Sequence, residues 1–242
     1  MKKIIALVLA LCCIFAIVSC NGNSGNVDEA TSAKLAEVLQ MFDDSIPTRA
    51  ETKTTEKIGN VVLESTALLA TGMMADGTKA SLYEGSFQSL REVGNSLEMK
   101  VEQPESKWYI EGKGVSTDKG ITFDAEAGDF APTEGFIKLA ISDSMISEAK
   151  WNEEDSTLTL TVTQEHATNV VAAYLEEGQT IDSDIVITIV TAGGRITGLK
   201  LEFSTPTHTV NVGEDGGTLE IPSTSVTIDT KYIYGLQTIS FE

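Results

Sequence analysis

The sequence predicts a mainly β protein of the α+β class, built as a curved antiparallel sheet or half-barrel with an N-terminal amphipathic helix and one short inserted helix. Apolar residues alternate with period two over most of the chain, short turn signals separate the alternating runs, and few stretches show helical spacing. Short turns join neighbouring strands antiparallel, whereas parallel strands need long crossovers. A β-sandwich made from the same strands is the alternative.

The helical spacing is clearest between Asp28 and Asp43. Within that range, apolar residues recur at intervals of three and four, which indicates one apolar face. These residues are Leu35, Val38, Leu39 and Phe42. Lys34 is the only base on the polar side, so we expect the helix to pack on the protein's own core, with a position on a membrane surface as the alternative. Pro47 then ends the helix region.

Strict alternation predicts half-buried strands along the remainder of the chain. The predicted strands are Leu97–Glu102, Ile121–Glu126, Thr157–Thr163, Ile185–Thr191, Leu199–Phe203, Leu219–Ile221 and Val226–Tyr234, and a further strand is expected to start at Trp108-Tyr109 after a turn. Turn signals such as Asp76-Gly77 and Gly193-Gly194 lie between strands.

Three less regular segments need separate assignments. The apolar run Val61–Met74 is interrupted by Thr66, Thr71 and Gly72 and predicts a buried strand. Lys79–Val93 fits a helix or a strand, and its glycine and serines favour a strand. His166–Leu175 predicts the short inserted helix.

The N-terminus divides into a leader and a tether before a single β-rich domain at residues 28–242. Residues 1–19 have a basic start and an apolar stretch too short to span a bilayer readily, as in a signal peptide. Residues 20–27 are mostly small and polar, which is typical of a flexible tether. An uncleaved membrane anchor and a second domain boundary near residues 142–151 are the alternatives.

The end of the leader, Ile17-Val18-Ser19-Cys20, resembles the lipobox of bacterial lipoproteins. The resemblance implies cleavage between Ser19 and Cys20, a diacylglyceryl group on the Cys20 thiol with palmitate as an acyl chain, and anchoring on the extracytoplasmic side of a membrane in the bacterial cell envelope. A plain signal peptide with an unrelated cysteine is the alternative. Once the leader is removed, Cys20 is the sole cysteine, so no intramolecular disulfide is expected.

Charge argues against nucleic acid as a partner. Without Lys2 and Lys3 the mature chain has 15 basic and 36 acidic residues, a net charge of −21. Such a protein repels phosphate backbones. The acidic residues mostly alternate with apolar ones, which indicates a solvated outer face. Pairs such as Asp182 and Asp184 lack the loop of an EF-hand, so calcium is the weaker interpretation.

No catalytic, metal or cofactor constellation is predicted. His166 and His208 are the only histidines, and they lack the spacing of a zinc site. No serine lies in a G-x-S-x-G elbow, and the Gly-rich stretches fit hairpin turns better than phosphate loops. Paired carboxylates for glycan hydrolysis stay open as a less favoured alternative.

The order of elements resembles the LolA/LolB and LppX/LprG-type lipoprotein-carrier superfamily, in which a curved antiparallel sheet holds acyl chains. Segments such as Tyr109–Gly114 and Asp129–Pro132 are also similar to secreted lipoproteins of gut bacteria. The resemblance implies a non-catalytic binder of a hydrophobic or lipid ligand, and it assigns no functional residue. We expect one face of the curved sheet, together with the helix stripe Leu35, Val38, Leu39 and Phe42, to line the cavity. The alternative is a surface display or adhesion module with a filled core. In that case we expect the side chains of Trp108, Tyr232 and Tyr234 to point outward in one patch.

Overall fold

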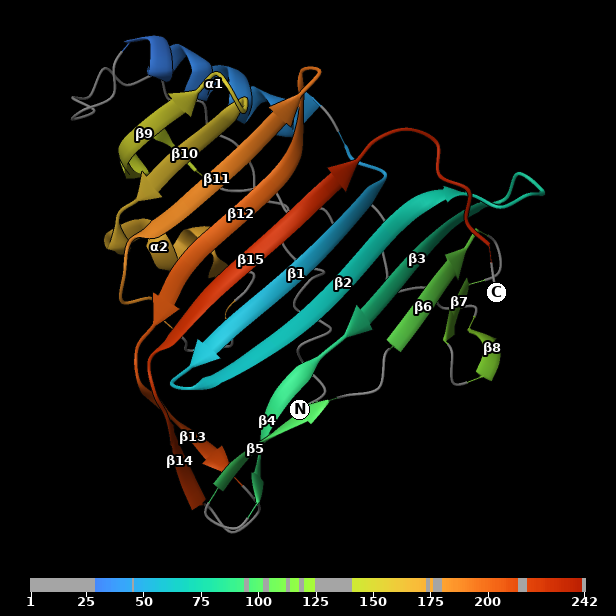
Figure 1. The fold of residues 1–242 in the computed structure, drawn as a ribbon. Coiled ribbons are helices and arrows are strands. Elements are labelled where there is room, and N and C mark those ends of the chain that lie inside the picture. Colours follow the sequence, from blue (N-terminus) through green and yellow to red (C-terminus); the bar gives the residue numbers. More distant parts are fainter. Residues whose placement is uncertain are drawn as a thin grey trace.

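A computed structural model of the protein describes residues 29–44, 46–93, 96–101, 105–111, 114–117, 120–124, 141–172, 175, 180–212 and 217–240. Its main element is one open antiparallel sheet of 11 strands (Figure 1). In the described residues this sheet is accompanied by helices α1 (Glu29–Asp44) and α2 (Gln164–Val170) and the 3-10 helix η2 (Asp143–Met145). The predicted fold class, a mainly β protein with an open antiparallel sheet and few helices, is confirmed.

The strands of the large sheet follow each other in a simple spatial order. Across the sheet the order is β8 (Gly120–Asp124), β7 (Gly114–Thr117), β6 (Glu105–Ile110), β3 (Lys79–Ser86), β2 (Val61–Met73), β1 (Arg49–Ile58), β15 (Thr224–Ile233), β12 (Arg195–Thr205), β11 (Ile185–Ala192), β10 (Thr157–Val162) and β9 (Ile146–Asn152). Two further hairpins, β4 (Gln88–Val93) with β5 (Ser96–Val101) and β13 (His208–Val212) with β14 (Gly217–Ile221), extend from it (Figure 1).

The last long strand joins the two halves of the sheet. β15 pairs with β1 from Arg49 opposite Ile233 to Ile58 opposite Thr224, and with β12 on its other side. All pairings between named strands are antiparallel, and from β12 through β15, β1, β2 and β3 to β6 the register has no shift, so each face of the sheet is continuous across these strands.

The face toward the helices, called the helix face below, carries the main core. Alternate residues of the strands from β10 to β12 point to it and are fully buried, as Leu160, Ile187 and Leu201 show. Leu35 and Val38 of α1 join the same cluster. Each large apolar side chain buried in this way contributes about 1.5–3 kcal/mol. The prediction that the N-terminal helix docks on the protein's own core is confirmed.

The sequence prediction omitted β1, β7, β9 and β13. β1 reads Arg-Ala-Glu-Thr-Lys-Thr-Thr-Glu-Lys-Ile, and only Ala50 and Ile58 are buried, so it shows no apolar alternation. β9 has a register shift opposite Thr161 and Val162, which leaves Ile146 and Ala149 both buried although they are three residues apart. That spacing hides period two.

The inserted helix lies earlier than predicted. α2 begins at Gln164 and ends at Val170, whereas His166–Leu175 was expected. The backbone amide of Gln164 donates to Oδ1 of Asp184 at 2.8 Å, which satisfies an N–H group that the first turn leaves without an intrahelical partner. Lys79–Val93 forms strands β3 and β4, and Val61–Met73 forms β2, as predicted, although β2 is only partly buried.

Candidate functional site

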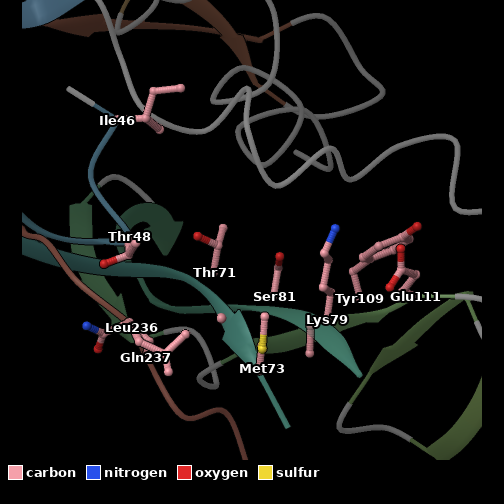
Figure 2. Close-up of a pocket in the computed structure, with 12 residues that line it drawn as sticks. Ile46, Thr48, Thr71, Met73, Lys79, Ser81, Tyr109, Glu111, Leu236 and Gln237 are labelled. Atoms are coloured by element: carbon pink, nitrogen blue, oxygen red, sulfur yellow. The ribbon is translucent and has the colours of Figure 1, made fainter. Parts of the chain in front are cut away.

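A pocket of about 360 Å³ lies where β2, β3 and β6 meet the C-terminal segment, and it is called the β2–β3 pocket below (Figure 2). Four separate parts of the chain form it: the residues before β1, the end of β2 with the start of β3, the end of β6, and the residues after β15. The lining residues are Ile46, Thr48, Thr71, Gly72, Met73, Lys79, Ala80, Ser81, Tyr109, Glu111, Leu236 and Gln237.

Register explains why polar side chains gather on its floor. Thr71 lies opposite Ser81, and Ser81 lies opposite Tyr109, so three hydroxyl groups form one row across β2, β3 and β6. In the next row the backbone amide of Glu111 donates to the carbonyl oxygen of Lys79 at 3.0 Å. Figure 2 shows the side chains of both rows rising from the same side of the sheet.

The pocket lies on the helix face of the sheet. Tyr232 of the main core is opposite Ala50, Ala50 is opposite Leu69, and Leu69 is opposite Tyr83. Leu69 and Tyr83 are buried and form a smaller cluster beside the hydroxyl row. The face that packs beneath α1 and α2 at one end of the sheet therefore forms the pocket floor at the other end.

The segment after β15 forms one wall of the pocket. The amide of Met73 donates to the carbonyl oxygen of Gln237 at 3.0 Å, and the amide of Ile239 donates to the carbonyl oxygen of Met73 at 3.0 Å. Ile239 is buried against Ala80 and Ile110 on the opposite face of the sheet. These bonds fix Leu236 and Gln237 beside β2.

Exposed apolar side chains collect at the pocket. Ile46 is 65% exposed, Met73 40% and Leu236 78%, and these are three of the seven large apolar side chains exposed within the described residues. Single exposed apolar side chains are ordinary, but several at one hollow indicate a surface that binds an apolar partner.

The pocket also has two charged side chains, Lys79 and Glu111. Within the part of the chain that the structure describes, neither makes an ion pair or side-chain hydrogen bond. The lining therefore combines apolar side chains, hydroxyl groups, one cation and one anion, a set that can bind an amphiphile.

The predicted helix stripe lies elsewhere. Leu35 and Val38 are buried in the main core, and Leu39 and Phe42 are partly buried against it. None of the four lines the β2–β3 pocket. Their contact with a ligand stays a prediction. Ser19 and Cys20, together with the rest of the leader and tether, lie outside the described residues.

The outward aromatic patch expected for an adhesion module is not formed by Tyr232. This residue is buried in the main core, and burial raises the pKa of its phenol well above the usual range. Tyr234 is partly buried, its hydroxyl donates to the carbonyl oxygen of Ile196 at 2.7 Å, and desolvation raises its pKa, while Arg195 opposes the shift. The structure does not describe the side chain of Trp108.

His208 and Asp182, two of the polar residues singled out in the sequence, have local structural partners. His208 Nδ1 lies 3.2 Å from the carbonyl oxygen of Pro206, and His166 is partly buried on α2. Asp182 accepts a hydrogen bond from the Ser204 hydroxyl at 2.6 Å. Among the described residues there is no group of three or more His, Cys, Asp or Glu suited to a metal ion.

No helix in the described part of the chain is both long and apolar enough to cross a membrane.

The comparisons with known proteins give distant likenesses. No protein-family model matches the chain, and no curated protein matches it. A crystal structure of a DUF1329 family protein from Desulfovibrio piger is similar at 11% identity and a TM-score of 0.24, over 86% of this chain and 95% of that one. A putative outer membrane lipoprotein-sorting protein domain from Vibrio parahaemolyticus is similar at 8% identity and a TM-score of 0.22, over 84% of this chain and 93% of that one. At these TM-scores neither likeness bears on the site.

The pocket could not be found from the sequence. Its parts span Ile46 to Gln237, and each part alone contains ordinary strand or loop residues. The one local signal is Gly72 within an apolar run, because a glycine inside a strand often marks a close approach of another backbone.

Proposed function

We propose that the protein is a non-catalytic, lipid-anchored protein of the bacterial cell envelope that binds an amphiphilic ligand in the β2–β3 pocket. The observation that supports this most directly is the concentration of exposed Ile46, Met73 and Leu236 around a row of hydroxyl groups. Such a lining matches a molecule with an apolar chain and a polar head.

The anchor and the pocket serve one purpose in this proposal. The lipid on Cys20 holds the protein at a membrane, where amphiphiles are concentrated. The pocket then takes one of them from that membrane or presents one to it. The register of the helix face supports a role in binding, because hydroxyl groups and apolar side chains lie on one continuous surface.

The test uses the chain from Asn21 onward, which contains every described residue and lacks the anchor. The protein is purified from a bacterial host and examined by native mass spectrometry for bound amphiphiles, then titrated with a single-chain lipid. We expect a bound mass in the range of a lipid, or uptake on titration. A bare protein mass with no uptake would contradict the proposal.

A matched pair of variants locates the binding. Leu236→Ser removes an exposed apolar side chain from the pocket, and Val62→Ser removes one that is 47% exposed on the opposite face of β2. We expect Leu236→Ser to weaken uptake and Val62→Ser to leave it unchanged, with both variants folded by circular dichroism. Equal effects would place the binding elsewhere.

A further inference from the structure

The two charged residues of the β2–β3 pocket lie directly opposite each other. Lys79 is on β3, and Glu111 follows the end of β6, where its amide donates to the Lys79 carbonyl oxygen. Opposed residues of neighbouring antiparallel strands have Cβ atoms about 4.5–5.5 Å apart. Their side chains rise from the sheet on the same side (Figure 2).

These opposed charges do not pair, although other charges on the same sheet do. The Lys53 Nζ atom lies 2.6 Å from Glu64 Oε1, and the Lys200 Nζ atom lies 2.8 Å from Glu202 Oε1. Within the described residues, Lys79 and Glu111 form no such pair. Both are exposed, so their ammonium and carboxylate groups are available to a ligand.

The neighbouring groups extend this polar site. The hydroxyls of Thr71 and Tyr109, both partly exposed, lie one row away along the strands and can donate to phosphate or ester oxygens, and the buried Ser81 lies between them. The exposed apolar side chains Ile46 and Leu236 belong to other segments of the lining. The pocket thus has a charged and hydroxylated floor beside an apolar wall.

Electrostatic complementarity decides between head groups. A purely anionic head bound to Lys79 brings its charge next to the Glu111 carboxylate, and a purely cationic head bound to Glu111 meets the Lys79 ammonium. Like charges placed together disfavour the wrong partner. A head group with both charges pairs with both residues.

We infer that the ligand of the β2–β3 pocket is an amphiphile with a zwitterionic head group, whose anionic part pairs with Lys79 and whose ammonium pairs with Glu111. The inference rests on the proposed function, because it names the class of ligand for the same pocket.

The experiment compares three probes with the same lauroyl chain below their aggregation concentration: a lysophospholipid with a phosphoethanolamine head, one with a phosphoglycerol head, and monolaurin, which is uncharged. Affinities for the chain from Asn21 onward are measured by calorimetry at fixed ionic strength. We expect the phosphoethanolamine probe to bind about fivefold more tightly than either other probe, a size set by exposed ion pairs.

Variants assign the two charges. Lys79→Met should weaken the binding of the phosphoethanolamine and phosphoglycerol probes but not the binding of monolaurin. Glu111→Gln should tighten the binding of the phosphoglycerol probe and remove the preference for the phosphoethanolamine probe. Lys57→Met on β1, on the opposite face of the sheet, and Glu148→Gln on β9 make the same charge changes away from the pocket and should leave all three affinities unchanged.

The outcomes separate this inference from the proposed function. Equal binding of the three probes, or a preference that Glu111→Gln does not alter, would overturn the zwitterionic head group while the amphiphile pocket stands. Binding of none of the probes, together with a bare mass on purification, would overturn both.

Discussion

Gly72 and Gln237 are so close that a Cβ atom at position 72 would overlap the carbonyl oxygen of Gln237. The same Gln237 oxygen accepts the hydrogen bond from the Met73 amide. The C-terminal segment can therefore lie against β2 only because residue 72 has no side chain. One wall of the β2–β3 pocket depends on this contact.

Gly72→Ala should displace the C-terminal segment. The overlap is with backbone, which cannot rotate away, so we expect a loss of about 1–3 kcal/mol in the free energy of unfolding, as for other overpacked sites. Faster hydrogen exchange at the amides of Met73 and Ile239 would report the displaced segment. Gly198→Ala is the control, since its Cβ would lie 3.3 Å from the Val190 side chain and 3.9 Å from the carbonyl oxygen of Thr230, without the overlap with backbone found at Gly72. Slow exchange at both amides in Gly72→Ala would show that the contact does not hold the segment.

Leu158→Ala should be among the most destabilising single changes in the sheet. Leu158 is fully buried in the main core, so its truncation leaves a cavity and costs about 2–5 kcal/mol. Thr159→Ala, on the other face of the same strand, should stay within about 0.5 kcal/mol of wild type. Urea denaturation measures both. Similar losses for the two variants would contradict the assignment of the helix face.

Ionisation of Tyr232 should lower the free energy of unfolding at high pH. Its pKa is raised in the folded state, so folding favours the neutral phenol. The stabilisation is complete below the unfolded pKa of about 10 and falls as pH rises above it, by at most about 1.4 kcal/mol per pH unit. Unfolding free energies measured between pH 7 and pH 11.5 should fall more steeply in wild type than in Tyr232→Phe. At pH 7 the phenol is neutral, so the difference in unfolding free energy between the two proteins at that pH gives the effect of losing the hydroxyl alone. Parallel curves would refute the prediction.

Cys20→Ala should stop maturation of the chain. The lipobox resemblance predicts that lipid is added to the Cys20 thiol and that the leader is then removed. We expect the variant to keep its leader and take up no labelled palmitate, as judged by intact mass and labelling. Cys13→Ala, inside the leader, should be processed normally. Palmitate on the Cys20→Ala protein would place the lipid elsewhere.

The sequence was a good guide to the part of the fold where burial is one-sided. β10 and β11 alternate buried residues with partly buried or exposed ones without a break, and both were predicted within about one residue of their ends. The last long strand was equally visible, because Ile228 and Tyr232 recur on its buried side. In these strands one face packs against the core and the other lies toward solvent, and this difference alone makes every second residue apolar.

The central strand β1 could not be predicted for the opposite reason. It lies between β2 and β15, yet its helix-face residues include Thr52, whose hydroxyl lies 3.0 Å from that of Thr230. A polar pair of this kind satisfies itself and needs no apolar residue. The pocket was invisible for a related reason, since only the register brings Thr71, Ser81 and Tyr109 together.

The position of β15 has a consequence for synthesis. The Thr48 hydroxyl donates to the carbonyl oxygen of Ile233 at 3.1 Å across 185 residues, and β15 is the strand through which β1 and β12 are joined. Until residues 224–233 have been made, β1 and β12 each lack the partner that β15 provides. Unpaired strand edges are sites of aggregation, and contacts so distant in sequence form slowly. The nascent protein therefore has two strand edges, on β1 and β12, that other chains can pair with until its last long strand is made.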